Sequence, residues 1–101
     1  MLVRNYKEVP VVNTGHGAEK RVVIGPKEGA PNFVMRVIDM PPGASYYHSH
    51  DWEHEVFVLS GEASLVGENG ETRLKPNDVI YIAPFEKHGL ANDGDKAFRF
   101  I

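Results

Sequence analysis

Histidine is the residue type in this sequence best placed to do chemistry, because four of the five histidines lie between residues 48 and 88. Three of them, His48, His50 and His54, fall within one short segment, and His88 opens a later predicted strand. Neutral imidazoles bind Mn, Fe, Co, Ni, Cu or Zn, and affinity order alone does not choose among these metals. The histidines therefore predict a site for one divalent transition metal.

The spacing of the histidines constrains the chain around them. On a β-strand, residues two apart point to the same face about 6.6 Å apart, so His48 and His50 can bind one ion from a single strand. If that strand continued, His54 would lie about 13 Å beyond His50, too far to share an ion with bonds of about 2.1 Å. We therefore expect a turn at residues 51–52, after which His54 enters a neighbouring strand and His88 completes the set.

Other kinds of catalytic site find little support in the sequence. There is no cysteine, which excludes disulfides, thiolate ligands and cysteine nucleophiles. No serine or lysine has a neighbouring base that would activate it. His16 stands alone between two glycines and is interpreted as a loop residue. Metal chemistry is the only chemistry that the residue types indicate.

The elements that must position these histidines are short strands. Runs of β-branched and aromatic residues separated by Gly, Pro, Asn and Asp predict an all-β chain, and many short strands at this spacing indicate a sandwich or barrel. The expected strands are Arg21–Ile24, Phe33–Met40, Tyr46–His50, His54–Ser60, Glu62–Val66, Glu71–Leu74, Val79–Ala83, His88–Ala91 and Ala97–Ile101. Asn69-Gly70 predicts a type I′ turn. Residues 21–101 form the expected barrel core, and residues 1–20 an N-terminal arm with a candidate edge strand at Val9–Val12.

Length and charge limit the remaining classes of function. A chain of 101 residues has room for one domain. The formal net charge is −3 and basic residues are not clustered, which argues against binding to nucleic acid. No segment approaches the roughly 20 apolar residues that span a bilayer, so no membrane partner is expected. The N-terminus lacks a secretory signal pattern, and a cytoplasmic location is expected.

Two segments carry a resemblance to a known family. Residues 42–61 contain a glycine, the pair His48 and His50, a possible acidic ligand a few residues later, and a closing glycine. This pattern resembles the first cupin motif, and residues 78–92 look like the second. The resemblance implies a small double-stranded β-helix, the jelly-roll barrel of cupins, in a single domain.

The match is closer to small single-domain manganese-binding cupins. These share the string Ala30–Arg36 and a His-Ser-His-x-Trp-Glu-His-Glu core, which here spans His48–Glu55. The resemblance implies four histidine ligands, manganese as the metal and a homodimer. Two positions depart from the general pattern: Asn77 stands where glycine is common, and Pro84 precedes His88 by one residue fewer than usual.

His54 and Glu55 compete for one place at the metal. Pleating sends adjacent residues to opposite faces, so both cannot face the ion without a bulge. The resemblance to the four-histidine subgroup favours His54. Glu53 and Glu55 then stand as alternative ligands, as acceptors that orient an imidazole N–H, or as solvent-facing residues.

Arg36 is the other charged candidate near the site. The even-numbered residues 34–40 share one strand face, where Arg36 is the only charge in an apolar row. It is expected to pair with a glutamate or to hold a substrate carboxylate. Aromatic residues are further candidates for the pocket mouth, with core or dimer contacts as the alternative: Tyr46, Tyr47, Trp52, Phe85, Phe98 and Phe100.

Three hypotheses of function follow. The first is a Mn- or Fe-dependent oxidoreductase acting on a small organic substrate; the resemblance implies dioxygenase-like cleavage of a carbon–carbon double bond. The second is a non-enzymatic module that binds a metal or small ligand, because one fold hosts many functions. The third is a metal-assisted isomerase or lyase with Glu53, Glu55 or Tyr46 as its base.

Overall fold

The computed structural model describes residues 1–101 and is almost entirely β-structure. All nine strands expected from the sequence are present, with ends within two residues of their predicted positions. The strands are β1 Val12–Asn13, β2 Glu19–Ile24, β3 Met35–Met40, β4 Ser45–His48, β5 His54–Ser60, β6 Ala63–Gly67, β7 Gly70–Leu74, β8 Val79–Ile82, β9 His88–Ala91 and β10 Phe98–Phe100. Two short 3-10 helices, Tyr6–Glu8 and Pro26–Glu28, were not predicted.

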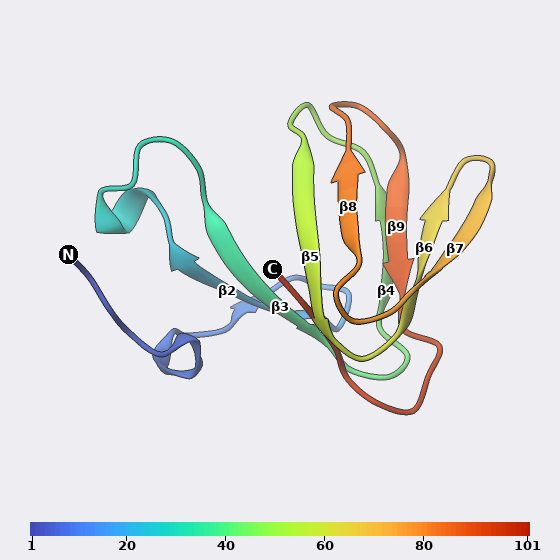
Figure 1. Ribbon diagram of the computed structural model, residues 1–101, viewed down its shortest axis with the longest axis horizontal. Coiled ribbons are helices and arrows are strands. Elements are labelled where there is room, and N and C mark those ends of the chain that lie inside the picture. The colour runs from blue at the N-terminus through green and yellow to red at the C-terminus, as the bar shows by residue number, and fades with distance from the viewer.

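The strands form two antiparallel sheets that enclose a core, as expected for a jelly-roll barrel (Figure 1). One sheet has the order β1-β2-β3-β10-β5-β8 and the other the order β4-β9-β6-β7. Met40, Val58 and Phe98 are fully buried between the sheets. The even-numbered residues of β3 face this core, which confirms the predicted alternation for that strand. No helix in the structure is long and apolar enough to cross a membrane.

Backbone conformation explains two sequence features and corrects a third. Gly61 has φ +81°, and a Cβ there would lie 2.2 Å from the carbonyl oxygen of Ala97, so only glycine fits. Asn77 has φ +76°, a left-handed conformation that asparagine tolerates in place of the common glycine. The type I′ prediction for Asn69-Gly70 is wrong, because Gly70 has positive φ but Asn69 does not. The turn residues precede Gly70, which already belongs to β7.

A second apolar cluster lies on the outer face of the six-stranded sheet. Val9, Val23 and Val37 are buried there, and Tyr6 packs against them from the N-terminal segment. Asp39 lies on the same face, in the register row that β2, β3 and β10 share. It pairs with Arg99 at 2.6 Å and with Arg21 at 3.5 Å, and both guanidinium groups lie over the ring of Tyr6. The N-terminal segment therefore covers one end of this face.

Asn92 fastens the segment between β9 and β10. Its side-chain amide is 2 % exposed and donates to the carbonyl oxygens of Met40 and Lys96 at 2.9 and 2.8 Å. Its own oxygen accepts from the backbone N–H of Gly94. This buried side chain is fully hydrogen-bonded, and it connects the segment between β9 and β10 to the end of β3.

Candidate metal centre

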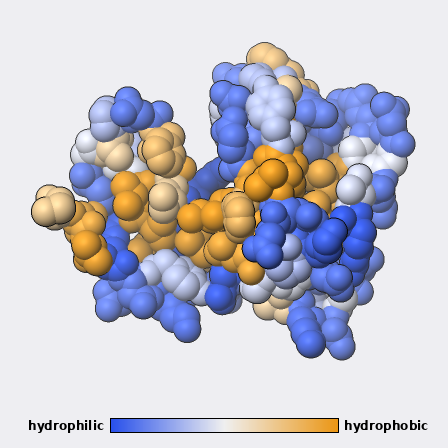
Figure 2. Space-filling model, in the orientation of Figure 1, coloured by the Kyte–Doolittle hydropathy of each residue, from blue (hydrophilic) through white to orange (hydrophobic).

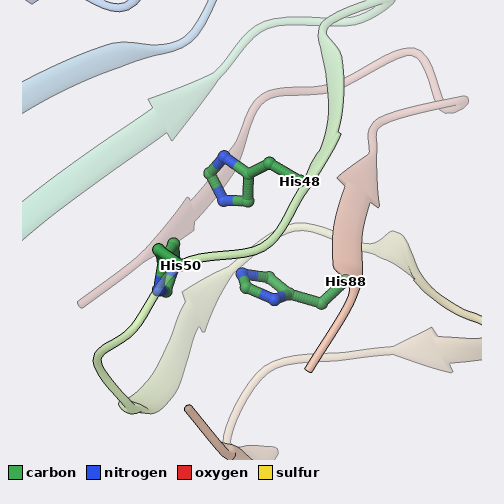
Figure 3. Close-up of side chains that lie close together, drawn as sticks. All are labelled: His48, His50 and His88. Atoms are coloured by element: carbon green, nitrogen blue, oxygen red, sulfur yellow. The ribbon is translucent and has the colours of Figure 1, made fainter. Parts of the chain in front are cut away.

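Three histidines converge at one end of the barrel (Figure 3). His48 ends β4 and His88 begins β9, and the two residues are direct partners in the antiparallel register. His50 joins them, and the ligand nitrogens of all three lie within 4.8 Å of one another. His50 lies beyond the end of β4, so the prediction that it shares a strand with His48 is wrong. The loop nevertheless returns its imidazole to the cluster.

The predicted turn brings His54 to the same place. The chain bends at residues 51–52 and β5 begins at His54, which confirms the turn. Nε2 of His54 lies 2.8 Å from Nε2 of His50. Two nitrogens bound at right angles to one ion would be about 3.0 Å apart for bonds of about 2.1 Å. His54 is therefore close enough to share a ligand with His50.

Backbone carbonyls fix the tautomer of two of the imidazoles, which leaves the Nε2 lone pair of each free to bind a metal. Nδ1 of His50 donates to the carbonyl of Trp52 at 2.9 Å, and Nδ1 of His88 donates to the carbonyl of Glu86 at 2.7 Å. Each bond places the proton on Nδ1 and leaves the lone pair on Nε2. Nε2 of His88 is buried and has no hydrogen-bond partner. A buried nitrogen without a partner costs free energy, and a metal ion at this point would satisfy it.

The loops around His50 hold it in position. The indole of Trp52 stacks on its imidazole with the ring centroids 4.1 Å apart and the planes within 7°. The backbone N–H of Phe85 donates to the carbonyl of His50 at 2.6 Å, which joins the β8–β9 loop to the β4–β5 loop. The side chain of Phe85 is itself exposed, so its contribution comes through the backbone, which no residue type reveals.

Arg36 projects from β3 toward His54 and has no acidic partner. Its guanidinium donates to Nδ1 of His54 at 3.1 Å, and it takes part in none of the ion pairs of the chain, so the expected pairing with a glutamate is absent. This bond leaves the proton of neutral His54 on Nε2. Metal binding through Nε2 would require the proton to move to Nδ1 and the guanidinium to turn away. His54 thus differs from the other three histidines.

Burial and nearby positive charge favour the neutral form of two of the imidazoles, those of His54 and His48. Burial, followed by the charge of Arg36, lowers the pKa of His54 to about 4. Burial and the neighbouring imidazoles of His88 and His50 lower the pKa of His48. Burial also lowers the pKa of Arg36. Neutral imidazoles keep the lone pairs that metal binding requires.

Tyr46 and His16 adjoin the cluster on the barrel side. Tyr46 lies two residues before His48 on β4, and their ring centroids are 4.8 Å apart. Burial raises the pKa of Tyr46 to about 12. His16 lies in the β1–β2 loop, and its ring lies 4.9 Å from that of Tyr46. This contact could not be predicted from residue patterns, because it joins residues thirty positions apart.

Other candidates from the sequence lie away from the cluster. Glu53 and Glu55 are exposed, and Glu55 pairs with Tyr81 on the face opposite to His54. The neighbouring carboxylate of Glu53 raises the pKa of Glu55, because it accepts a hydrogen bond from the protonated form. Phe100 lies in the hydrophobic core rather than at the pocket mouth, with its ring 5.5 Å from that of Phe98.

A groove of about 510 Å³ borders the cluster at His88. It runs between the β6–β7 hairpin and the loop that joins β8 to β9, and Tyr81 and Glu86 are among its lining residues. His48 is exposed on the other side of the cluster. The cluster is therefore open to small molecules.

Comparison with known proteins relates the chain to one family. Residues 36–101 match the family model described as Cupin domain. Glucose-6-phosphate isomerase of Pyrococcus abyssi (strain GE5 / Orsay) is 30% identical over 110 residues, which cover 94% of this chain and 55% of that protein. Glucose-6-phosphate isomerase of Thermococcus litoralis is 32% identical over 90 residues, covering 74% and 46%. The chain thus spans about half the length of these curated relatives.

Solved structures show the same architecture. The polyketide cyclase RemF from Streptomyces resistomycificus superposes with a TM-score of 0.92 at 27% identity, over 99% of this chain and 75% of that one. A predicted oxalate decarboxylase from Thermotoga maritima gives a TM-score of 0.79 at 22% identity, over 98% and 94%. These neighbours are named for different activities. The similarity therefore supports the fold, and the reaction must be inferred from the residues of the site.

Proposed function

We propose that this chain, which belongs to the cupin domain family, binds one divalent transition metal through His48, His50 and His88, with His54 as fourth ligand. The buried, unpartnered Nε2 of His88 is the observation that carries this proposal. The donors are all neutral, so a bound ion keeps its full positive charge. That charge favours anionic or peroxide-type ligands at the open positions.

The reaction that we propose is oxidation of a small organic substrate, with dioxygenase-like cleavage of a carbon–carbon double bond. Mn is the first choice of metal, because the resemblance to the manganese-binding cupins implies it, and Fe is the second; both accept more ligands than four imidazoles supply. When bound, the ion would supply a redox-active centre with room for an oxidant beside the substrate.

Arg36 and Tyr46 are proposed to hold the substrate. The guanidinium of Arg36 has no carboxylate partner, so it can bind an anionic group of the substrate. The phenol of Tyr46, with its pKa raised to about 12, stays protonated and donates a hydrogen bond. An anion that engages Arg36 would also release Nδ1 of His54 to carry the proton, which frees Nε2 for the metal.

Isomerisation is the second candidate, and it is favoured by the similarity to the two archaeal glucose-6-phosphate isomerases. Such a reaction needs a base that moves a proton between neighbouring carbons. In this chain Glu53 and Glu55 are exposed away from the cluster, and Tyr46 holds its proton. None of these three candidate bases is an ionised group beside the histidines, which favours oxidation over isomerisation.

The test begins with metal analysis of protein purified without a histidine tag. Wild type is expected to hold one Mn or Fe per chain, His88→Ala to lose it, and His16→Ala, the matched control outside the cluster, to keep it. The Mn and Fe forms are then incubated with an aryl alkene carboxylate, with dioxygen or peroxide and without either oxidant. Glucose 6-phosphate without oxidant forms the parallel assay.

Each outcome separates the alternatives. Carbonyl products that require the oxidant support the proposed reaction. Isomerisation of the sugar phosphate without oxidant supports the second candidate instead. Bound metal with neither activity indicates a metal-binding module without catalysis. Wild type that takes up no metal, or a His88→Ala variant that retains it fully, refutes the ligand assignment.

A further inference from the structure

Trp52 joins the histidine cluster to the surface of the molecule. Its indole stacks on the imidazole of His50, with the ring centroids 4.1 Å apart and the planes within 7°. Its carbonyl also accepts the hydrogen bond from Nδ1 of that imidazole, so Trp52 holds one candidate metal ligand in two ways. The residue is nevertheless 55% exposed, and it is the only tryptophan of the chain. One aromatic ring therefore contacts both a candidate metal ligand and the surrounding solution.

Ring contact of this kind gives a single electron a short path to or from the cluster. Indole and phenol are the aromatic side chains that lose one electron most readily, and both adjoin the histidines. The phenol of Tyr46, whose ring lies 4.8 Å from that of His48, takes part in no hydrogen bond of the structure. A phenol that loses an electron must also pass on its proton, and Tyr46 has no acceptor for it. The exposed indole of Trp52 can exchange a proton with water, so Trp52 is the better placed of the two.

The surface next to Trp52 is negatively charged. Asp51 and Glu53, its neighbours in the chain, are exposed and take part in none of the ion pairs. In Figure 2 the upper end of the barrel, where Figure 1 shows the β4–β5 and β8–β9 loops, is mostly hydrophilic surface around a small apolar area. Exposed carboxylates attract cations over a distance of about 10 Å in ordinary salt. A molecule that reaches the indole is therefore favoured if it carries positive charge.

We propose that Trp52 passes single electrons from cationic donors at the surface to the histidine cluster, which lets the chain oxidise molecules that are too large to reach the metal. This inference rests on the proposed function, since a redox-active metal, when bound, supplies the centre that peroxide oxidises. One hydrogen peroxide takes up two electrons and two protons and gives two molecules of water, so two donors lose one electron each. The indole gives an electron through His50 and regains it from the donor, so Trp52 is unchanged at the end.

Oxidation of Trp52 itself is the first test, because it is read from the chain rather than from a product. Metal-loaded and metal-free protein are treated with hydrogen peroxide without a donor, and their peptides are examined by mass spectrometry. Without a donor the indole loses two electrons and two protons and takes up water, which gives hydroxytryptophan, while the peroxide becomes water. One added oxygen atom is expected on Trp52 of the loaded protein, and ferrocytochrome c should suppress it. Equal oxidation of the metal-free protein, or oxidation of Tyr46 with Trp52 intact, overturns the proposal.

Two substitutions of Trp52 separate electron transfer from simple support of His50. Trp52→Phe and Trp52→Tyr both keep a ring that can stack on the imidazole, but only tyrosine is readily oxidised. Both variants are expected to bind the metal. With peroxide and ferrocytochrome c, a basic protein too large to enter the barrel, Trp52→Phe should oxidise the donor no faster than metal-free protein, and Trp52→Tyr should lie between that rate and wild type. Equal rates for the two variants indicate a purely structural role and refute the relay.

Charge variants test the preference for cationic donors. Asp51→Asn should slow the oxidation of ferrocytochrome c at low ionic strength, and added salt should remove the difference from wild type. Glu62→Gln is the matched control, since Glu62 is an exposed carboxylate beyond the far end of β5, and it should react like wild type. An Asp51→Asn variant that also reacts like wild type refutes the preference for cations.

The same preparations distinguish failure of the relay from failure of the proposed function. Each is analysed for metal and assayed with the aryl alkene carboxylate and peroxide. Wild type that takes up no metal refutes both. Alkene cleavage together with a Trp52→Phe variant that oxidises ferrocytochrome c at the wild-type rate refutes the relay alone. Oxidation of ferrocytochrome c that depends on Trp52, without alkene cleavage, supports the relay and refutes the proposed cleavage reaction.

Discussion

Replacement of Arg36 by methionine should raise stability while it weakens the binding of anions. Arg36 is partly buried, and its one hydrogen-bond partner is the neutral imidazole of His54. Full burial of an ion costs several kcal/mol, and about 2 to 3 kcal/mol is reasonable for partial burial. The lost hydrogen bond, which the charge of the guanidinium strengthens, costs about 1.5 kcal/mol. Arg36→Met should therefore stabilise the metal-free protein by about 1 kcal/mol.

Urea unfolding and thermal melts of the metal-free protein measure the first effect. For a domain of this size each kcal/mol shifts the thermal midpoint by about 4 to 8 °C, so a rise of that size is expected. Calorimetric titration with benzoate measures the second effect. Loss of a charge-assisted hydrogen bond of about 1.5 to 3 kcal/mol predicts binding that is roughly 10- to 100-fold weaker.

Arg36→Lys is the matched control, because it keeps the charge in the barrel and loses only the planar fork. It should not gain the stability of the methionine variant. A methionine variant that is less stable than wild type would show that the guanidinium is not a strained, unpaired charge. Unchanged benzoate affinity would remove Arg36 from the proposed substrate site.

Four further predictions concern the histidines and their support. In chelator competition, His88→Ala should weaken Mn binding more than about 100-fold, beyond the 10- to 100-fold typical of a residue that only orients a ligand. His54→Ala should weaken it less without benzoate than with it, and equal losses would contradict the role of Arg36 as a competitor for that imidazole. The folded-state pKa of His54, about 4, lies below the unfolded value of 6.5. The stability that neutral His54 contributes is therefore present above pH 6.5 and is lost as the pH falls towards 4. The urea midpoints of the metal-free protein should follow this trend, and His54→Gln should flatten the pH dependence. Gly89→Ala would place a Cβ 2.0 Å from the carbonyl oxygen of Tyr46, so a loss of about 3 kcal/mol or more is expected, and a normal urea midpoint would show that β4 and β9 can separate.

The strands were predictable because each is short, apolar and bounded by turn residues. His48 and His54 were predictable as neighbours because their spacing demands a turn between two strands. The register that places His48 opposite His88 could not be predicted from the sequence, because it joins strands forty residues apart. The family resemblance implied only that His88 belongs to the same set of metal ligands as His48.

Contacts made through the backbone were the main features that residue patterns missed. The bond from Phe85 to His50 and the carbonyls that hold the imidazoles depend on loop conformation, which these residue types do not reveal. Arg36 was predictable as an isolated charge on an apolar face. Its neutral partner was not, because ion pairing with a carboxylate is the ordinary solution for a buried cation.

The candidate ligands are divided between the two sheets, with His48 and His88 on the four-stranded sheet and His54 on the six-stranded sheet. A bound ion would therefore be a cross-link in a chain that has no cysteine to form one. It would close the loop from residue 48 to residue 88 and restrict the unfolding of either sheet alone. The availability of the metal would then determine the lifetime of the folded chain as well as its chemistry, and removal of the metal by a chelator would make the chain unfold.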